Sequence, residues 1–317
     1  MPEQDGFILP PVGLWTGALD MVPASRAREL AAELESLGYG AVWLPEVAGR
    51  DPFVHLAMLL SATDRMIGAT GIASIWARDA VTTSCVAKTL TEAFPERVVV
   101  GLGVSHENLV GNLRGHRYDK PMTAMRHYLD AIGQAPYTAN RPTTPVRYVL
   151  GALRPRMLEL AGTRTQGAHP YLVTTEHTAR ARSILGEGPL LCPEQAVVLE
   201  TDAEKARAIA RRHVGVYLAQ PNYVHNLRYL GFGDADLTPP GGSDALVDAL
   251  VAWGDVEQVV ACIREHLDAG ADHVPVQVLS EHKRGVPDTQ WRELAAPLLE
   301  LASARRSSSR VHSMSIE

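Results

Sequence analysis

Two side chains stand where acid–base chemistry is expected, each just beyond a predicted strand. Glu46 follows the apolar run 41–44 and a proline, where a carboxylate can act as an acid, a base or a hydrogen-bond partner of a cofactor ring. His106 follows the run 98–102 and three further residues, and an imidazole titrates near neutral pH. Structural alternatives stay open, because Glu46 can pair with Arg50 and His106 can be an ordinary loop residue. We predict His106 as the first candidate for proton exchange and Glu46 as the second.

The glycines before His106 allow a ligand to approach the backbone closely. Gly101 and Gly103 have no side chain at the end of a strand. A dinucleotide-binding fingerprint needs a third glycine where His106 stands, so that class of site is excluded. The sequence has no Walker motif, zinc-protease helix or nucleophile elbow. Trp15 and Trp76, each at a strand end, either wall the same pocket or belong to the core.

A second kind of site is predicted for an anion. Gly151 and Ala152 lead directly into a helix that begins near 154–156, and Thr174 and Thr175 add two hydroxyls before the next helix. Backbone N–H groups at a helix start attract anions through the exposed donors and the helix dipole. Two neighbouring starts of this kind are typical of a phosphate cradle, although hydroxyl caps also occur without any ligand.

The elements that position these residues alternate along the chain. Short apolar runs are separated by segments with helical periodicity, which is typical of a parallel sheet with crossover helices. One helix is predicted over 25–37, ended by Gly38, while Asp51 and Asp79 are predicted to cap the next two. The eight predicted strands are 12–15, 41–44, 66–73, 98–102, 147–150, 168–173, 194–199 and 273–278.

Eight such rounds predict an α/β fold of the (β/α)8 TIM barrel type. In a barrel, the loops at the carboxyl ends of the strands build the site, and Glu46, His106 and the glycines all fall there. The segment 202–253 has several helical runs broken by prolines and is interpreted as a helical insertion before the last strand. We predict a single domain over 1–306 and a flexible tail over 307–317.

Composition narrows the class of protein. The 317 residues are 46% apolar and 21% charged, which suits a globular protein with a large aliphatic core. A net charge of −6 and the lack of a dense basic patch argue against a nucleic-acid partner. The three cysteines fit no zinc or disulfide spacing, and neither a signal peptide nor a membrane-spanning run is visible. We expect a cytoplasmic protein.

Several runs of the sequence resemble the luciferase-like monooxygenase superfamily, and more narrowly its F420-dependent oxidoreductases. The similarity extends over most of the chain, and the runs that carry it are 70–79, 98–106, 157–162, 269–274 and 277–279. This resemblance implies a cofactor ring that lies over a bulge in the third strand, with a cis peptide at Gly71–Ile72.

The resemblance also assigns site residues. It places Glu46 beside the deazaflavin ring and His106 near the reacting carbon. The residues that it implies for cofactor binding are Gly71, Ile72, Ala73, Gly103 and Ser105 for the ring and Gly151, Ala152, Thr174 and Thr175 for the phosphate. Sugar-phosphate dehydrogenases of this family have a histidine where Val47 stands and a glutamate where His106 stands, so the resemblance does not extend to their substrate.

The predicted activity is hydride transfer between the deazaflavin F420 and a small organic substrate. The alternative on the same fold is an FMN-dependent monooxygenase, which needs a flavin reductase as a partner. There are two further hypotheses. One is a hydrolase or lyase that uses Glu46 and His106 without a redox cofactor, and the other is a barrel that binds a ligand without catalysis. Family likeness implies a homodimer.

Overall fold

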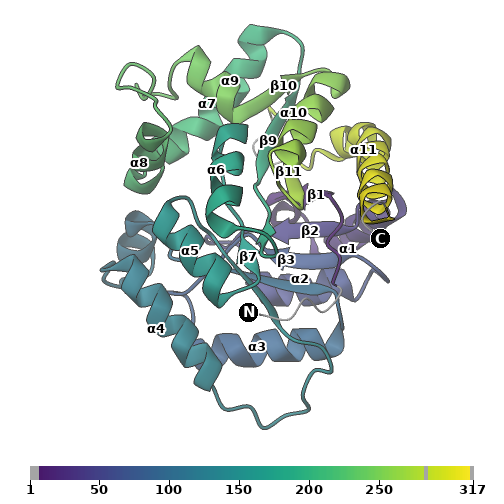
Figure 1. Ribbon diagram of the computed structural model, residues 1–317, viewed down its shortest axis with the longest axis vertical. Coiled ribbons are helices and arrows are strands. Elements are labelled where there is room, and N and C mark those ends of the chain that lie inside the picture. Colours follow the sequence, from purple (N-terminus) through teal and green to yellow (C-terminus); the bar gives the residue numbers. More distant parts are fainter. Residues whose placement is uncertain (1–6, 282–284, 315–317) are drawn as a thin grey trace.

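The computed structural model describes residues 7–281 and 285–314, which form an α/β fold around a curled parallel sheet (Figure 1). Every strand pair is parallel, and the hydrogen-bonded order is β10-β9-β11-β1-β2-β3-β5-β6-β7-β8, with β4 paired to β5. The strands are β1 (Val12–Trp15), β2 (Ala41–Leu44), β3 (Ile67–Thr70), β4 (Ala73–Ser74), β5 (Val98–Gly103), β6 (Arg147–Leu150), β7 (Gly167–Ala168), β8 (Leu190–Leu191), β9 (Gln195–Leu199), β10 (Val251–Gly254) and β11 (Val274–Val278).

Helices follow most strands and cover the outside of the sheet. The bounds of the α-helices are α1 (Ala24–Ser36), α2 (Pro52–Leu60), α3 (Ala80–Ala93), α4 (Pro121–Gln134), α5 (Pro155–Arg164), α6 (Thr175–Leu185), α7 (Ala203–Leu218), α8 (Pro221–Tyr229), α9 (Asp244–Leu250), α10 (Val256–Asp268) and α11 (Asp288–Met314). A 3-10 turn (Ala18–Met21) and a π-helical turn (Leu109–Leu113) lie in the loops after β1 and β5. None of the helices within the described ranges is long and apolar enough to cross a membrane.

The predicted helix caps are confirmed. The Asp51 carboxylate accepts from the backbone N–H groups of Phe53 and Val54 at the start of α2. The Asp79 carboxylate accepts from the N–H of Thr82 at the start of α3. Both acids therefore satisfy backbone donors that have no partner within the helix.

Several predicted strands differ from the observed ones. The run 66–73 is not one strand, because the chain breaks after β3 and resumes as β4. Of the predicted strand 168–173, only Ala168 lies in a strand, as the last residue of β7, and the chain then leaves the sheet. Two short strands, β8 and β10, were not predicted, since two apolar residues or a strand directly after a helix give little periodic signal.

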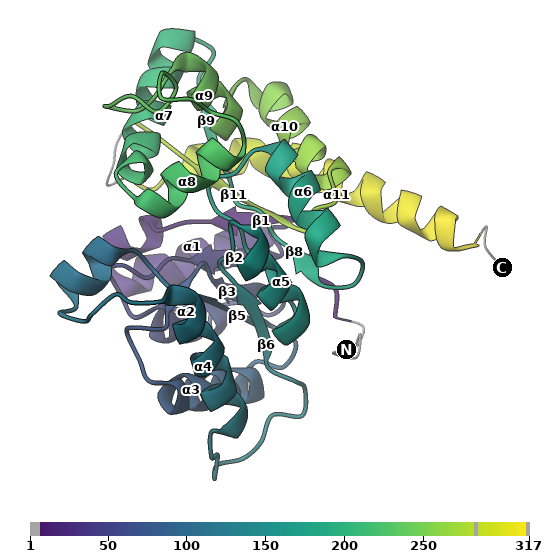
Figure 2. The same cartoon turned by 60° about the vertical axis from the view of Figure 1, so that its left-hand side comes forward.

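The segment 202–253 contains α7, α8 and α9, which lie together at one end of the molecule (Figure 1), and it ends in β10, which extends the sheet beside β9. At the other end of the chain, α11 projects away from the body (Figure 2). This helix extends through position 314, and 315–317 lie outside the described residues. The single domain and the flexible tail stay predictions.

A stack of rings fills the interior of the curled sheet. The indole of Trp43 lies 4.3 Å from the ring of His169 and 5.8 Å from that of His273, both measured between centroids. All three side chains are no more than 1% exposed. Trp43 Nε1 donates to His273 Nε2 (2.9 Å), and His273 Nδ1 bonds to the carbonyl of Pro10. The histidine rings are thus fixed by both packing and hydrogen bonds.

Three buried histidines should make the fold sensitive to acid. Burial lowers the pKa values of His169, His266 and His273 to about 4, about 4 and about 3. In the unfolded chain these imidazoles bind protons below pH ~6.5, whereas in the folded chain they stay neutral down to their lowered pKa values. We therefore expect the free energy of unfolding to fall as the pH drops from ~6.5 towards ~4, by up to about 1.4 kcal/mol per pH unit for each histidine.

Denaturant unfolding at pH 7 and pH 5 measures this effect. A matched control is His127→Asn, at an exposed position of α4, which should leave the pH dependence unchanged. Equal stability at the two pH values would contradict the neutral state of the buried rings.

Candidate functional site at the carboxyl ends of the strands

A cavity of about 650 Å³ opens where the strands end. Its wall combines the end of β1 and the segments after β2, β3, β5, β6 and β7 with residues from α7 and α8. Trp15 lines the cavity, but Trp76 is not part of its wall. The predicted site residues that line it are Glu46, Gly71, Ile72, Gly103, Ser105, His106, Gly151 and Ala152.

Three predicted cofactor-binding residues lie outside the wall of this cavity. Ala73 is 1% exposed and pairs with Leu102 in the sheet. The Thr174 hydroxyl caps α6 by accepting from the N–H of His177 (3.2 Å), and Thr175 is the first residue of that helix. The hydroxyl of Thr174 therefore acts as a helix cap, which was the alternative to a role in phosphate binding.

The break between β3 and β4 shapes one wall. The Gly71–Ile72 peptide is cis, as the family resemblance predicts, and the Gly71 carbonyl accepts from Trp15 Nε1 (3.1 Å). A Cβ atom on Gly71 would lie 2.5 Å from Trp15 Nε1, and one on Gly103 would lie 2.5 Å from the Ile72 side chain. A side chain at Gly71 would therefore meet the Trp15 ring, one at Gly103 would require Ile72 to move, and backbone itself forms the surface that a flat ligand can contact.

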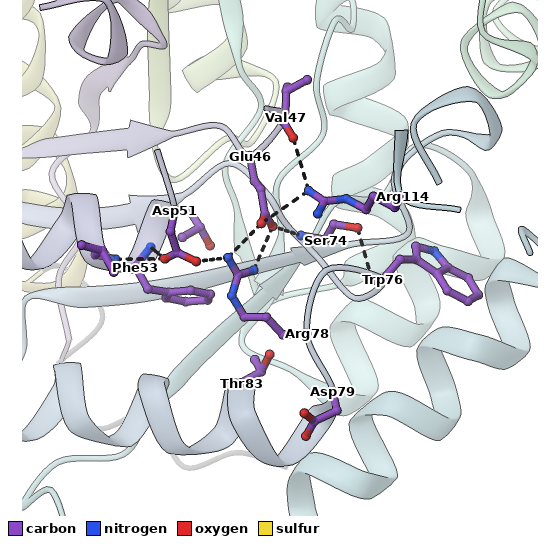
Figure 3. A network of polar contacts seen from close by, with 12 residues as sticks. Glu46, Val47, Asp51, Phe53, Ser74, Trp76, Arg78, Asp79, Thr83 and Arg114 are labelled. Atoms are coloured by element: carbon purple, nitrogen blue, oxygen red, sulfur yellow. Dashed lines mark hydrogen bonds and ion pairs between the residues drawn. The ribbon is translucent and has the colours of Figure 1, made fainter. Parts of the chain in front are cut away.

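An ion-pair network holds β4 in its displaced position (Figure 3). The Glu46 carboxylate accepts from the backbone N–H of Ser74 in β4 (2.7 Å) and from Arg78 Nη1 (3.0 Å). Arg78 Nη2 lies 2.8 Å from the same carboxylate, and Arg114 Nη2 lies 3.6 Å from it. The Glu46 side chain is only 7% exposed, so these partners offset the cost of burying its charge.

Arg78 extends the network to α2 (Figure 3). Its guanidinium also pairs with Asp51 and lies 4.9 Å from the centre of the Phe53 ring. Burial opposes the positive charge of Arg78, but the hydrogen bonds and charges of Glu46 and Asp51 outweigh burial and raise its pKa. The predicted alternative pair between Glu46 and Arg50 is not the one observed, since Arg50 donates to the carbonyls of Leu19 and Val22.

His106 lies in the cavity wall with its ring against α8. Its Nδ1 lies 3.3 Å from Asn222 Oδ1, and its ring centroid is 5.6 Å from that of Tyr223. Burial lowers its pKa, although the bond to Asn222 partly counteracts this. With Nδ1–H donated to the amide oxygen, Nε2 holds a lone pair that can accept a proton.

Sequence reasoning missed an aromatic wall on this side of the cavity. Tyr217 donates its hydroxyl proton to Tyr171 (2.9 Å), and Tyr171 donates to Gln277 Oε1 (2.7 Å). The ring of Tyr223 packs edge-on against Tyr217, with 4.9 Å between centroids. Tyr217 and Tyr223 come from α7 and α8, which were interpreted as an insertion with no assigned role, so only their aromatic character could have pointed to them.

The start of α5 forms another part of the cavity wall. The Arg154 side chain does not cap this helix, Pro155 has no N–H, and the N–H of Met157 donates to the Arg154 carbonyl, which leaves the Arg156 N–H and the Arg154 and Arg156 side chains as donors in the wall. An uncapped helix start with two nearby arginines favours an anionic group. Within the described residues, no cluster of three or more His, Cys, Asp or Glu side chains is arranged to hold a metal ion.

The cavity suits a flat ring with a negatively charged tail. Glycine backbone and Ile72 offer a surface for the ring, and the start of α5 offers donors for the tail. His169, which sequence reasoning also missed, lines the cavity, and its buried Nε2 has no hydrogen-bond partner within the described part of the chain. A bound ring can supply that partner.

The comparisons with known proteins identify the class. The profile of the luciferase-like monooxygenase family matches residues 6–273, and the chain belongs to this family. A protein of Mycobacterium tuberculosis named as a coenzyme F420-dependent oxidoreductase is 30% identical over 170 residues, a match that covers 54% of this chain and 47% of the relative, about half the length of each. The 5,10-methylenetetrahydromethanopterin reductase of Methanolobus tindarius is 25% identical, covering 82% of this chain and 93% of the relative.

Solved structures share the fold. An F420-dependent secondary alcohol dehydrogenase in complex with an F420–acetone adduct has a TM-score of 0.72 at 13% identity, covering 93% of this chain and 99% of the other. The oxygenating constituent of 3,6-diketocamphane monooxygenase from Pseudomonas putida, in complex with FMN, has a TM-score of 0.66 at 13% identity, covering 93% and 98%. At these identities the likeness concerns the fold alone.

The Glu46 network yields a stability prediction. Glu46→Gln removes the negative charge between Arg78 and Arg114, and we expect it to cost about 3 kcal/mol, because breaking a buried ion pair leaves an uncompensated charge. Asp51 still pairs with Arg78, which keeps the cost at the lower end. Chemical denaturation measures the loss. Glu29→Gln in the exposed pair with Arg26 is the matched control and should cost no more than about 1 kcal/mol; similar losses in the two variants would argue against a structural role for the network.

Proposed function

We propose that this protein is an F420-dependent oxidoreductase that transfers a hydride between the deazaflavin and a small organic substrate. The observation that carries the proposal is the cavity itself, with the Gly71 and Ile72 backbone in one part of its wall and Arg154 and Arg156 at the start of α5 in another. The family match and the F420-dependent relatives support the choice of cofactor.

We further propose that the curled sheet is a (β/α)8 barrel with α7, α8 and α9 as its insertion. Only 192–194 separate β8 from β9, and the two form one barrel strand in this reading. Since β8 pairs with β7 while β9 pairs with β11, a ring of eight strands is then complete. The cavity lies at the carboxyl rim of that ring, where barrel enzymes carry their sites.

The protein's own groups have separable tasks in this proposal. Gly71, Ile72 and Gly103 support the ring, and the start of α5 with Arg154 holds the phosphate. F420, when bound, supplies two-electron hydride chemistry. The chain excludes water and holds the substrate's reacting carbon in register with the ring.

His106 is the proton-exchanging residue of this proposal. Its lowered pKa keeps the imidazole neutral at pH 7, so Nε2 can take the proton that a substrate loses together with its hydride. Glu46 has a different task, because its carboxylate already accepts from Ser74 and Arg78. We assign Glu46 the positioning of β4 under the ring.

FMN-dependent oxygenation with a separate flavin reductase is the second candidate, favoured by the fold shared with the FMN-bound monooxygenase constituent. A homodimer remains part of the proposal.

Cofactor binding tests the function directly. Titration of the purified protein with F420 and with FMN, followed by fluorescence, should give at least tenfold tighter binding of F420. The dephosphorylated deazaflavin should bind at least tenfold more weakly than F420, because the charge-assisted contacts at α5 are lost. Tight binding of FMN without binding of F420 would reject the choice of cofactor, and equal affinity with and without phosphate would reject the anion site.

His106 is tested separately from binding. We expect His106→Gln to keep the affinity for F420 within about twofold, while turnover of the best substrate in a panel of small alcohols and ketones falls by ~10²–10⁴, the usual contribution of a general acid–base group. Asn222→Asp is a useful comparison, because a carboxylate at that position should raise the pKa of His106 and shift the pH–rate profile upward. Unchanged turnover in His106→Gln contradicts the assignment.

A further inference from the structure

His169 has a buried, unpartnered ring nitrogen next to the cavity. The side chain follows β7 directly and is 1% exposed. Its Nε2 is buried and has no hydrogen-bond partner among the residues that the structure describes. A Cβ atom on Gly71 would lie 3.0 Å from this Nε2, so the nitrogen stands beside the cis Gly71–Ile72 turn, and both residues line the cavity. A buried polar atom without a partner is costly, which points to a ligand that completes it.

The hydrogen bond on the other side of the ring fixes which proton His169 carries. Its Nδ1 lies 2.7 Å from the carbonyl oxygen of Cys192. A carbonyl oxygen only accepts, so Nδ1 must be the protonated nitrogen. In a neutral imidazole Nε2 then holds a lone pair, and burial keeps the ring neutral by lowering its pKa to about 4. The buried nitrogen beside the cavity is therefore an acceptor, and not a donor.

Packing holds the acceptor in place. The His169 ring stacks on Trp43 at 22° between planes, and Trp43 is fixed in turn by its bond to His273 Nε2. Rotation of the His169 ring would break the bond to Cys192 and place a C–H group against a carbonyl. Because its neighbours hold the His169 ring in place, binding of a ligand to this ring costs little conformational entropy.

We propose that His169 Nε2 accepts a hydrogen bond from the ring imide N–H of the bound redox cofactor. This inference rests on the proposed function and adds a residue that recognises the cofactor ring. Flavins and deazaflavins share a pyrimidinedione edge whose N–H lies between two carbonyls, and this N–H persists in both redox states. A neutral acceptor suits that N–H, whereas it would repel either carbonyl.

The shape of the cavity favours the ring over the substrate as the donor. The start of α5, with Arg154 and Arg156, offers the site for the anionic tail. His169 lies instead beside the Gly71 backbone, where the wall is formed by strand ends. With the tail held at α5, the ring is the part that reaches the Gly71 turn, and its imide edge is the donor available there.

Two substitutions test the roles of Nε2 and Nδ1 of His169 separately. His169→Asn retains a side-chain N–H at the position of Nδ1, which can still donate to Cys192, but removes the acceptor at Nε2. His169→Gln retains an acceptor near the position of Nε2 and loses the hydrogen bond to the Cys192 carbonyl. The probes are F420, FMN, and the N3-methyl derivatives of 8-hydroxy-5-deazariboflavin and FMN, which lack the imide proton. Their unmethylated parents are measured alongside, and His127→Asn in α4 is the matched control.

We expect His169→Asn to weaken binding of the unmethylated cofactor by roughly three- to tenfold, the effect of one hydrogen bond. His169→Gln should bind it more tightly than His169→Asn, although the thermal stability of His169→Gln is the lower of the two. The wild-type protein should prefer the unmethylated ring, and His169→Asn should lose that preference. In wild-type protein, the ¹⁵N signal of His169 Nε2 should move upfield when the cofactor binds.

The outcomes distinguish the two proposals. Unchanged affinity of His169→Asn, with the preference against the N3-methyl ring intact, would overturn the assignment of His169 while leaving the proposed function standing. Absence of binding of both F420 and FMN to the wild-type protein would overturn both. A loss of affinity that follows thermal stability across both variants, with no change in preference for the imide proton, would mean that His169 is purely structural.

Discussion

The shape of the site depends on one buried anion. Glu46 joins the loop after β2 to β4, because its carboxylate accepts from the Ser74 backbone while Arg78 and Arg114 balance its charge. Besides that link, β4 is held apart from β3 by its pairing with β5. The break at Gly71–Ile72, the approach of Ile72 to Gly103 and the bond from Trp15 to Gly71 all lie around this displaced strand. A charge network at the rim thus supports a wall made of backbone.

The histidines in the interior of the sheet carry no charge. His169 and His273 are buried in the ring stack with Trp43, and each has a tautomer fixed by a carbonyl oxygen. Charge is therefore concentrated at the rim, in the Glu46 network and at the start of α5, while the interior beneath offers neutral groups. Such a division lets a ring with alternating carbonyl and N–H groups meet neutral partners, while an anionic tail meets positive ones.

Much of this was predictable from local sequence. Solidly apolar runs such as 12–15 and 41–44 became strands with the predicted bounds, and Asp51 and Asp79 became caps, because these signals depend on neighbouring residues alone. The partners of Glu46 were not predictable, since Arg78 and Arg114 reach it through the fold. His169 gave no signal either, because a histidine within an apolar run reads as core until its partners are known. Thr174 matched a motif, yet its hydroxyl was needed by its own helix.

The origin of the aromatic wall has a consequence for how this protein can change. Tyr217, Asn222 and Tyr223 belong to α7 and α8, which lie in the chain between β9 and β10 and contribute these residues to the cavity wall. The surfaces proposed for the ring and its tail come from other segments. In the proposed function, substitutions in α7 and α8 other than at Asn222, which contacts His106, would therefore alter which molecules are accepted while leaving the cofactor contacts intact. Substrate scope and cofactor use would then depend on separate parts of the chain, which makes this helical segment a suitable target for directed evolution.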